Sequence, residues 1–298
     1  MLTKRISVFI SEVLILCFSN SYNHPILRPE YSDDFARNVM WPLAAGAYID
    51  HQQECITSAT GDGKLKRKLE YDCDILDEKC SAYTASSESK KAVIVAWRGS
   101  QINGEVPMEV LDILFGKQRV FPGGAKVADF FYDAFLNLWN TGIKDDFFTL
   151  RQQYPDYEVW VTGHSLGAAM AGLCAAYLVE LGLVPANQIK LMTFGEPRTG
   201  DSTYAALLDS LPYSYRVVHN HDPVPHVPFG IENYKHHRTE IYYSNTMAKG
   251  KPFTVCVGDE SHKCSEGVPV LLTNVLDHLD YYGEDVVGYF ERGCKYSK

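Results

Sequence analysis

Short apolar runs alternate with longer amphipathic segments through most of this sequence. The short runs are rich in β-branched and aromatic residues and predict buried strands, which fall at 92–97, 159–163, 189–194, 213–219 and 240–243. The longer segments predict helices, at 35–47, 107–115, 127–153, 168–184, 201–211 and from about 270 onward. Alternation of this kind predicts an α/β fold, a single domain whose mostly parallel sheet is flanked by helices.

One strand leads directly into Gly163-His164-Ser165-Leu166-Gly167, and the nearly all-apolar helical segment 168–184 follows. Strand, sharp turn and helix in this order are typical of a nucleophile elbow. Glycines two positions either side of Ser165 remove Cβ atoms that would clash in so tight a turn. The sequence therefore predicts Ser165 as a nucleophile at the N-terminus of a helix, where free N–H groups can stabilise an oxyanion.

A serine nucleophile needs a histidine base that a carboxylate orients, and in α/β-hydrolases the chain order is serine, acid, histidine. Asp222 is the best placed acid because it follows an apolar strand and is fixed by Pro223-Val224-Pro225. Asp201 opens a predicted helix, where N-capping is the simpler explanation. Glu196, at the end of the preceding strand, is a weaker candidate.

The base must come from the histidines that follow the acid. His226 is only four residues beyond it, His236 and His237 lie in a polar loop, and His262 lies between two nearby cysteines. His278 lies between an apolar turn and a pair of tyrosines, and we predict it to be the base.

Two histidines, His219 and His221, alternate onto one face of a predicted strand and raise the alternative of a zinc site. A third ligand at a familiar spacing is missing. We therefore expect neither a metal nor a cofactor. His164, beside the nucleophile, is expected to be a packed, hydrogen-bonded residue and not a catalyst.

The net charge and the N-terminal segment limit the partners and the compartment that we expect for this chain. The 298 residues carry a formal net charge of −9, which argues against nucleic acid or anionic membranes as partners. The basic cluster at 64–68 is expected in a surface turn. Residues 1–21 resemble a secretory signal, with Lys4 and Arg5 before an apolar run too short to span a bilayer comfortably, so secretion is predicted and stable membrane insertion is not.

The cysteines agree with an oxidising compartment. Cys17 lies in the signal, and Cys174 lies in the apolar helix behind Ser165. The six others suit three disulfides, with 15 possible pairings. They are Cys55, Cys73, Cys80, Cys256, Cys264 and Cys294.

Five ordered segments give the chain a clear resemblance. They are Ala96-Trp97-Arg98-Gly99-Ser100, Thr162 to Gly167, Thr193-Phe194-Gly195-Glu196-Pro197-Arg198, His221 to Pro225, and Asp277-His278-Leu279-Asp280-Tyr281-Tyr282. Together they resemble the class 3 lipases, a branch of the α/β-hydrolases, from about residue 35 to the end. The resemblance implies a catalytic triad and an oxyanion hole, and a lid at about 101–121. The implied triad is Ser165, Asp222 and His278, and the implied oxyanion hole is Ser100 with the N–H of Leu166.

The resemblance also bears on the disulfides and on the pocket wall. With sequence proximity, it favours the pairs Cys73–Cys80, Cys256–Cys264 and Cys55–Cys294. Family members often carry Val-His-x-Gly-Phe after the lid, where this chain has Val127-Ala128-Asp129-Phe130-Phe131. The missing histidine and glycine are expected to alter acyl or head-group preference.

The leading hypothesis is a secreted, monomeric hydrolase of lipid acyl esters, with triacylglycerol the favoured substrate at an oil–water or membrane interface. The domain would occupy 22–298 after removal of the signal. A phospholipase A1 or a soluble-ester esterase would use the same triad. A secreted binding protein that keeps the fold without turnover is the alternative from another class.

Overall fold

The computed structural model of the chain describes residues 29–73, 79–99, 115–229 and 233–297. The predicted signal at 1–21, Ser100, and the helix expected at 107–115, apart from Phe115, lie outside these residues. Within them, no helix combines the length and the apolar character needed to cross a membrane.

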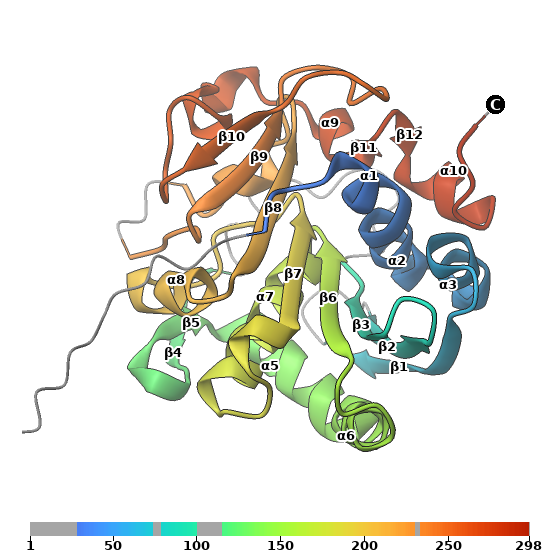
Figure 1. Cartoon of the computed structure of the whole chain (residues 1–298). Coiled ribbons are helices and arrows are strands. Elements are labelled where there is room, and N and C mark those ends of the chain that lie inside the picture. The colour runs from blue at the N-terminus through green and yellow to red at the C-terminus, as the bar shows by residue number, and fades with distance from the viewer. Residues whose placement is uncertain (1–28, 74–78, 100–114, 230–232, 298) are drawn as a thin grey trace, which may run out of the picture.

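A central sheet of eight strands organises the fold, in the order β1-β2-β3-β6-β7-β8-β9-β10 (Figure 1). Neighbours from β3 to β9 are parallel, and the pairs toward both edges are antiparallel. The strands are β1 Lys64–Asp72, β2 Lys79–Ser87, β3 Ala92–Trp97, β6 Glu158–His164, β7 Ile189–Phe194, β8 Tyr213–His219, β9 Thr239–Tyr243 and β10 Thr254–Val257. All five predicted strands are present, with β3, β7 and β8 at the predicted bounds.

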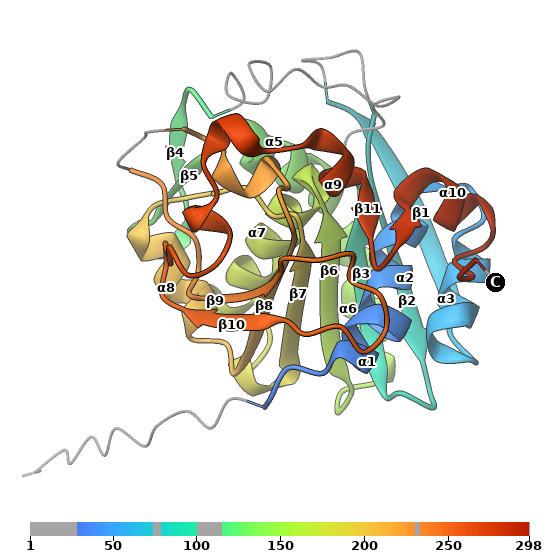
Figure 2. The ribbon, with the colours of Figure 1, turned by 90° about the horizontal axis from the view of Figure 1, so that it is seen from above.

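Helices cover both faces of this sheet (Figures 1 and 2). One core contains α5 Asp129–Leu138, α6 Lys144–Gln153, α7 Leu166–Glu180 and α8 Ser202–Asp209. The other contains α1 Asp33–Phe35, α2 Trp41–Ala45, α3 Gln52–Thr60 and α10 Val286–Glu291. Strand β3 serves both cores, because Val93 and Val95 point to the first and Ala92 and Ile94 to the second.

Two small ribbons and a short helix complete the structure. Strands β4 Gln118–Val120 and β5 Lys126–Ala128 form an antiparallel pair, and β4 lies in the C-terminal part of the predicted lid, 101–121. Helix α9 Val275–Leu279 leads into the pair β11 Asp280–Tyr281 and β12 Glu284–Asp285.

Several predicted details were wrong. The basic cluster at 64–68 lies on strand β1 at the sheet edge, not in a surface turn. Two of its cations pair within the molecule, Arg67 with Asp146 at 2.7 Å and Lys68 with Asp50 at 2.6 Å. Charged side chains along an edge strand oppose unwanted strand pairing, which explains the polar sequence.

Two helices also differ from expectation. The helix predicted at 35–47 begins earlier, at Asp33 with Ser32 as its N-cap, and it widens into a π-turn over Ala36–Met40 before Pro42. The long helix expected over 127–153 is interrupted at Gly142. Its φ of +156° is a backbone conformation that residues other than glycine rarely adopt. Two helices, α5 and α6, therefore replace one.

The three disulfides pair as predicted. They are Cys55–Cys294, Cys73–Cys80 and Cys256–Cys264. Cys174 is free and buried, and burial raises the pKa of its thiol far above the usual value. It acts as a small apolar side chain behind Ser165.

Candidate active site

Ser165 occupies the turn between β6 and α7. Its backbone lies in the left-handed region, with φ +59° and ψ −132°, and its N–H donates to the carbonyl of Phe194 at 2.9 Å. A Cβ on Gly163 would lie 2.3 Å from the carbonyl oxygen of Gly167. A Cβ on Gly167 would lie 2.3 Å from the carbonyl oxygen of Trp97. Both glycines are therefore needed for the turn that presents Ser165.

His278 and Asp222 meet beyond the carboxyl ends of the strands. Asp222 follows β8, and His278 is carried by α9. The Nδ1 of His278 lies 2.9 Å from both carboxylate oxygens of Asp222. Asp222 is fully buried, whereas His278 retains 6% exposure. The pair is thus shielded from water on the acid side and reachable on the histidine side.

Asp222 is held as a carboxylate despite its burial. Burial raises its pKa, but His278 and hydrogen bonds from Tyr281 and the Val224 N–H outweigh this and leave the pKa below its usual value. The Tyr281 hydroxyl donates at 2.8 Å and the Val224 N–H at 2.9 Å. Asp222 can therefore orient the Nδ1–H of His278 and stabilise positive charge on its ring.

His164 links the serine turn to His278. The two imidazoles stack with centroids 4.5 Å apart, and Nε2 of His164 lies 2.9 Å from the His278 carbonyl oxygen. A carbonyl only accepts, so Nε2 is protonated and Nδ1 accepts from the Tyr48 hydroxyl at 2.9 Å. Burial and the neighbouring His278 lower the pKa of His164 to about 3. His164 is packed and neutral.

The oxyanion-hole candidates can be placed only in part. Leu166 is the first residue of α7, so its N–H is one of those without an acceptor inside the helix. Ser100 lies outside the described residues. Its neighbour Gly99 lies against the turn, because a Cβ there would be 3.0 Å from the Cβ of Ser165.

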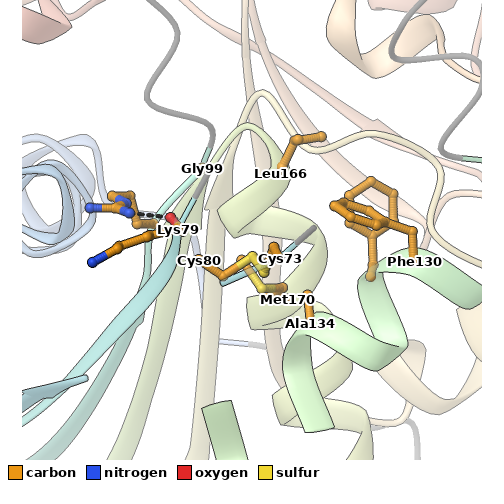
Figure 3. A pocket seen from close by; sticks show the side chains of 10 residues that line it. Cys73, Lys79, Cys80, Gly99, Phe130, Ala134, Leu166 and Met170 are labelled. Atoms are coloured by element: carbon orange, nitrogen blue, oxygen red, sulfur yellow. Dashed lines mark hydrogen bonds between the residues drawn. A yellow bond between two sulfur atoms is a disulfide. The ribbon is translucent and has the colours of Figure 1, made fainter. Parts of the chain in front are cut away.

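A small apolar hollow of about 30 Å³ lies beside Leu166 (Figure 3). The Cys73–Cys80 disulfide forms one part of its wall, and Phe130 and Ala134 of α5 form another. Met170 of α7 also lines it. Phe130 is one of the residues by which this chain departs from the Val-His-x-Gly-Phe segment, so that departure lies next to the serine turn.

The other acid candidates have structural partners. Asp201 is the N-cap of α8 and accepts from the Tyr204 N–H at 2.9 Å. Glu196 accepts from Thr193 at 2.6 Å and lies 3.2 Å from the Nε2 of His237. Both are therefore tied to groups other than His278.

Three of the remaining histidines have backbone partners away from Asp222. His236 lies 2.8 Å from the Pro225 carbonyl oxygen, and His262 is exposed, 3.3 Å from the Glu266 carbonyl oxygen. His219 lies 3.0 Å from the Asp277 carbonyl oxygen. Among the described residues, no three His, Cys, Asp or Glu side chains are grouped to hold a metal ion.

Known proteins resemble this chain over nearly its whole length. The family model for class 3 lipases matches residues 94–231. A lipase of Caenorhabditis elegans is 32% identical over 97% of this chain and 90% of its own length. The chain belongs to the class 3 lipase family. This class 3 lipase is therefore an ester-hydrolysing enzyme with the α/β-hydrolase fold.

Two further relatives extend the comparison. A secreted mono- and diacylglycerol lipase of Fusarium solani is 31% identical over 67% of this class 3 lipase, which spans 59% of that relative. A solved structure described as a triacylglycerol lipase with a serine protease triad superposes with a TM-score of 0.71. It is 28% identical and covers 85% of this chain and 95% of its own.

Sequence reasoning missed two polar contributors to the site. Tyr281 hydrogen-bonds the buried acid, and the Tyr48 hydroxyl hydrogen-bonds Nδ1 of His164. Tyr281 lies in the quoted segment Asp277–Tyr282, but its hydroxyl partner depends on how β11 packs. No motif included Tyr48.

Proposed function

We propose that Ser165, Asp222 and His278 form the catalytic triad of this lipase and that it cleaves lipid acyl esters through an acyl-enzyme. The observation that carries the proposal is the contact of His278 Nδ1 with both oxygens of a fully buried Asp222. The same imidazole stacks on the residue that precedes Ser165. This arrangement supplies a nucleophile, a base and an orienting carboxylate.

The reaction follows from these roles. Ser165 Oγ attacks the ester carbonyl carbon while His278 Nε2 takes the hydroxyl proton, and the carbonyl oxygen becomes an oxyanion that the Leu166 N–H stabilises. The tetrahedral intermediate collapses, the C–O bond breaks, and the alcohol leaves with the proton from His278. Water, deprotonated by His278, then attacks the acyl-serine carbonyl. The bond between the acyl carbon and Ser165 Oγ breaks, His278 returns the proton to Oγ, and the fatty acid leaves.

Substitutions with a matched control test the triad. We expect Ser165→Ala and Asp222→Asn each to lower kcat on p-nitrophenyl butyrate by about 10⁴-fold or more. Asp201→Asn is the control, because asparagine preserves the N-cap of α8. Activity of folded Ser165→Ala above a few per cent of wild type would reject the assignment. A wild-type protein without any turnover would support the binding-protein alternative.

We propose triacylglycerol as the substrate, supported by relatives described as triacylglycerol and mono- and diacylglycerol lipases. Head-group and chain-length choice depend on pocket shape, so the test compares trioctanoylglycerol, dioctanoylphosphatidylcholine and p-nitrophenyl butyrate side by side. Preference for the phospholipid would indicate a phospholipase A1. Preference for the soluble ester would indicate an esterase.

Secretion and the lid are also proposals. Three disulfides and the secreted fungal relative support export, and N-terminal sequencing of the mature protein tests cleavage after residue 21.

In the proposed lid, 101–121, residues 101–114 lie outside the described part. Phe115 and Phe121 are buried in the core, which supports a fixed C-terminal end. Replacing both Leu111 and Leu114 with serine should abolish activation by emulsion and spare soluble esters.

A further inference from the structure

An exposed apolar loop, residues 269–276, lies directly before His278. Within it Leu271 is 97% exposed, Leu276 65% and Leu272 61%, and Val270 is also exposed. Monomeric proteins rarely expose contiguous large apolar side chains without a binding role. Its last two residues begin α9, at the end of the sheet toward which the β6 and β7 arrows point (Figure 1).

The loop is uncharged, and the charges on either side of it are already partnered. No Asp, Glu, Lys or Arg occurs from Gly267 to Leu276. On one side, Glu266 pairs with Arg198 at 2.6 Å. On the other, the Asp277 carboxylate accepts from the Asn220 side chain at 3.0 Å and from the His221 N–H at 3.1 Å. Because both carboxylates have partners within the protein, moving the loop out of water does not strip the hydration from an unpaired charge.

The loop is held firmly against the strand end that carries the acid. The Asn274 N–H donates to the His221 carbonyl at 2.8 Å, next to Asp222. The Asn274 side chain in turn accepts from the Leu276 N–H at 3.0 Å, and the Thr273 N–H donates to the Val270 carbonyl at 3.2 Å. The leucines thus have a fixed position relative to His278.

We propose that the apolar loop is a docking surface for uncharged or zwitterionic lipid, and that Leu271 and Leu272 enter the acyl layer. The inference rests on the proposed function, because a surface beside His278 would place the site at the lipid. Exposure of these apolar side chains to water costs free energy, and their transfer into an acyl layer removes that cost. The acidic chain, with a net charge of −9, makes an anionic surface the less suitable partner.

The test measures binding and needs no turnover, so it is independent of the triad assignment. Flotation uses vesicles of ether-linked dialkyl phosphatidylcholine, which contain no ester to cleave. We expect the Leu271→Ser/Leu272→Ser variant to bind at least about tenfold more weakly than wild type, since each leucine that leaves water contributes about tenfold. The control is Leu181→Ser/Leu183→Ser. These leucines are exposed after the C-terminus of α7, at the opposite end of the sheet.

Equal losses in the test and control variants, unchanged binding of L271S/L272S, or failure of wild type to bind would each overturn the proposal. Conversion of a dimer to a monomer by L271S/L272S, with vesicle binding unchanged, would instead identify a second copy as the occupant.

A second variant keeps the proposal testable if the double variant fails to fold. All four native tryptophans are buried, so Leu271→Trp adds an exposed reporter. We expect its emission to shift to the blue and to be quenched by brominated acyl chains when vesicles are added. The Leu181→Trp variant should show neither change. An unchanged L271W spectrum with vesicles would overturn the proposal.

Discussion

The Tyr281 hydroxyl donates a hydrogen bond to Oδ2 of Asp222 over 2.8 Å, three residues after His278. Burial and the nearby Asp222 carboxylate raise the pKa of Tyr281 well above its usual value, so the hydroxyl stays protonated. The Tyr281 ring stacks on Trp41, with centroids 5.2 Å apart. The first helical region therefore positions the group that orients the proposed acid.

Tyr281→Phe should lower kcat/KM on a soluble ester by about ten- to a hundredfold, the range for losing one hydrogen bond to a charged group. The ring remains packed, so the fold should persist. Loss of the donor raises the pKa of Asp222, and the acid limb of the pH–rate profile should move to higher pH. Tyr282→Phe, which removes a neighbouring buried hydroxyl 3.2 Å from that of Tyr31, is the control. Equal effects of both variants would mean that Tyr281 acts through general stability alone.

His164 predicts a specific loss of stability in acid. Its pKa is lowered to about 3 in the folded protein, whereas an unfolded histidine titrates near 6.5. Between these values the unfolded state binds more protons, so its contribution to stability is complete above about pH 6.5 and falls as the pH falls, by up to about 1.4 kcal/mol per pH unit. His164→Gln should remove that part of the loss.

Urea unfolding at pH 7 and pH 4.5 measures this effect. The difference between the two pH values should be smaller in His164→Gln than in wild type, and unchanged in the control His262→Gln, where the histidine is exposed. A pH dependence in His164→Gln equal to that of wild type would show that His164 is not a buried neutral group.

The strands of the parallel core could be predicted because burial on both faces leaves an unmistakable apolar run. The Ala92–Trp97 segment is buried at every position and pairs with parallel β6 on one side. Strand β1 gave no such signal, since Lys64–Asp72 lies at the sheet edge with mostly exposed or half-exposed positions. Its partner β2 begins seven residues later, and local composition does not reveal that pairing.

The residues of the site also divide into those that the local sequence predicts and those whose contacts depend on packing. Strand ends and chain order were enough to select Asp222 and His278 as candidates, since parallel strands deliver their carboxyl ends to one edge. The hydroxyl contacts of Tyr281 and Tyr48 depend on packing between segments far apart in the chain. No spacing rule encodes such contacts.

The disulfides should differ in what they contribute to stability. Cys55–Cys294 spans 239 residues and Cys73–Cys80 only 7. In the chain-entropy model the long link contributes about 5 kcal/mol at most and the short one about half of that. Urea unfolding of the paired Cys→Ala variants should therefore show the larger loss for Cys55→Ala/Cys294→Ala. A larger loss for the short link would show that native-state contacts outweigh the loop entropy.

Phe130 should limit the acyl chain that this lipase accepts. Its side chain lines the small hollow beside Leu166, opposite the Cys73–Cys80 disulfide (Figure 3). Its ring packs on buried Phe131, with centroids 5.3 Å apart, so it does not move aside freely. Phe130→Ala would enlarge the hollow without the added backbone freedom that glycine would bring to α5.

Each additional methylene that the enlarged hollow buries contributes about 0.8 kcal/mol, or roughly fourfold in kcat/KM. We therefore expect Phe130→Ala to shift the optimum of a p-nitrophenyl ester series from butyrate to laurate toward longer chains. Phe148→Ala, on α6 and 39% exposed, is the control and should leave the chain-length profile unchanged. A uniform fall in kcat/KM at every chain length would show that Phe130 supports the fold of the wall and does not select the substrate, because only a change of pocket volume acts differently on short and long chains.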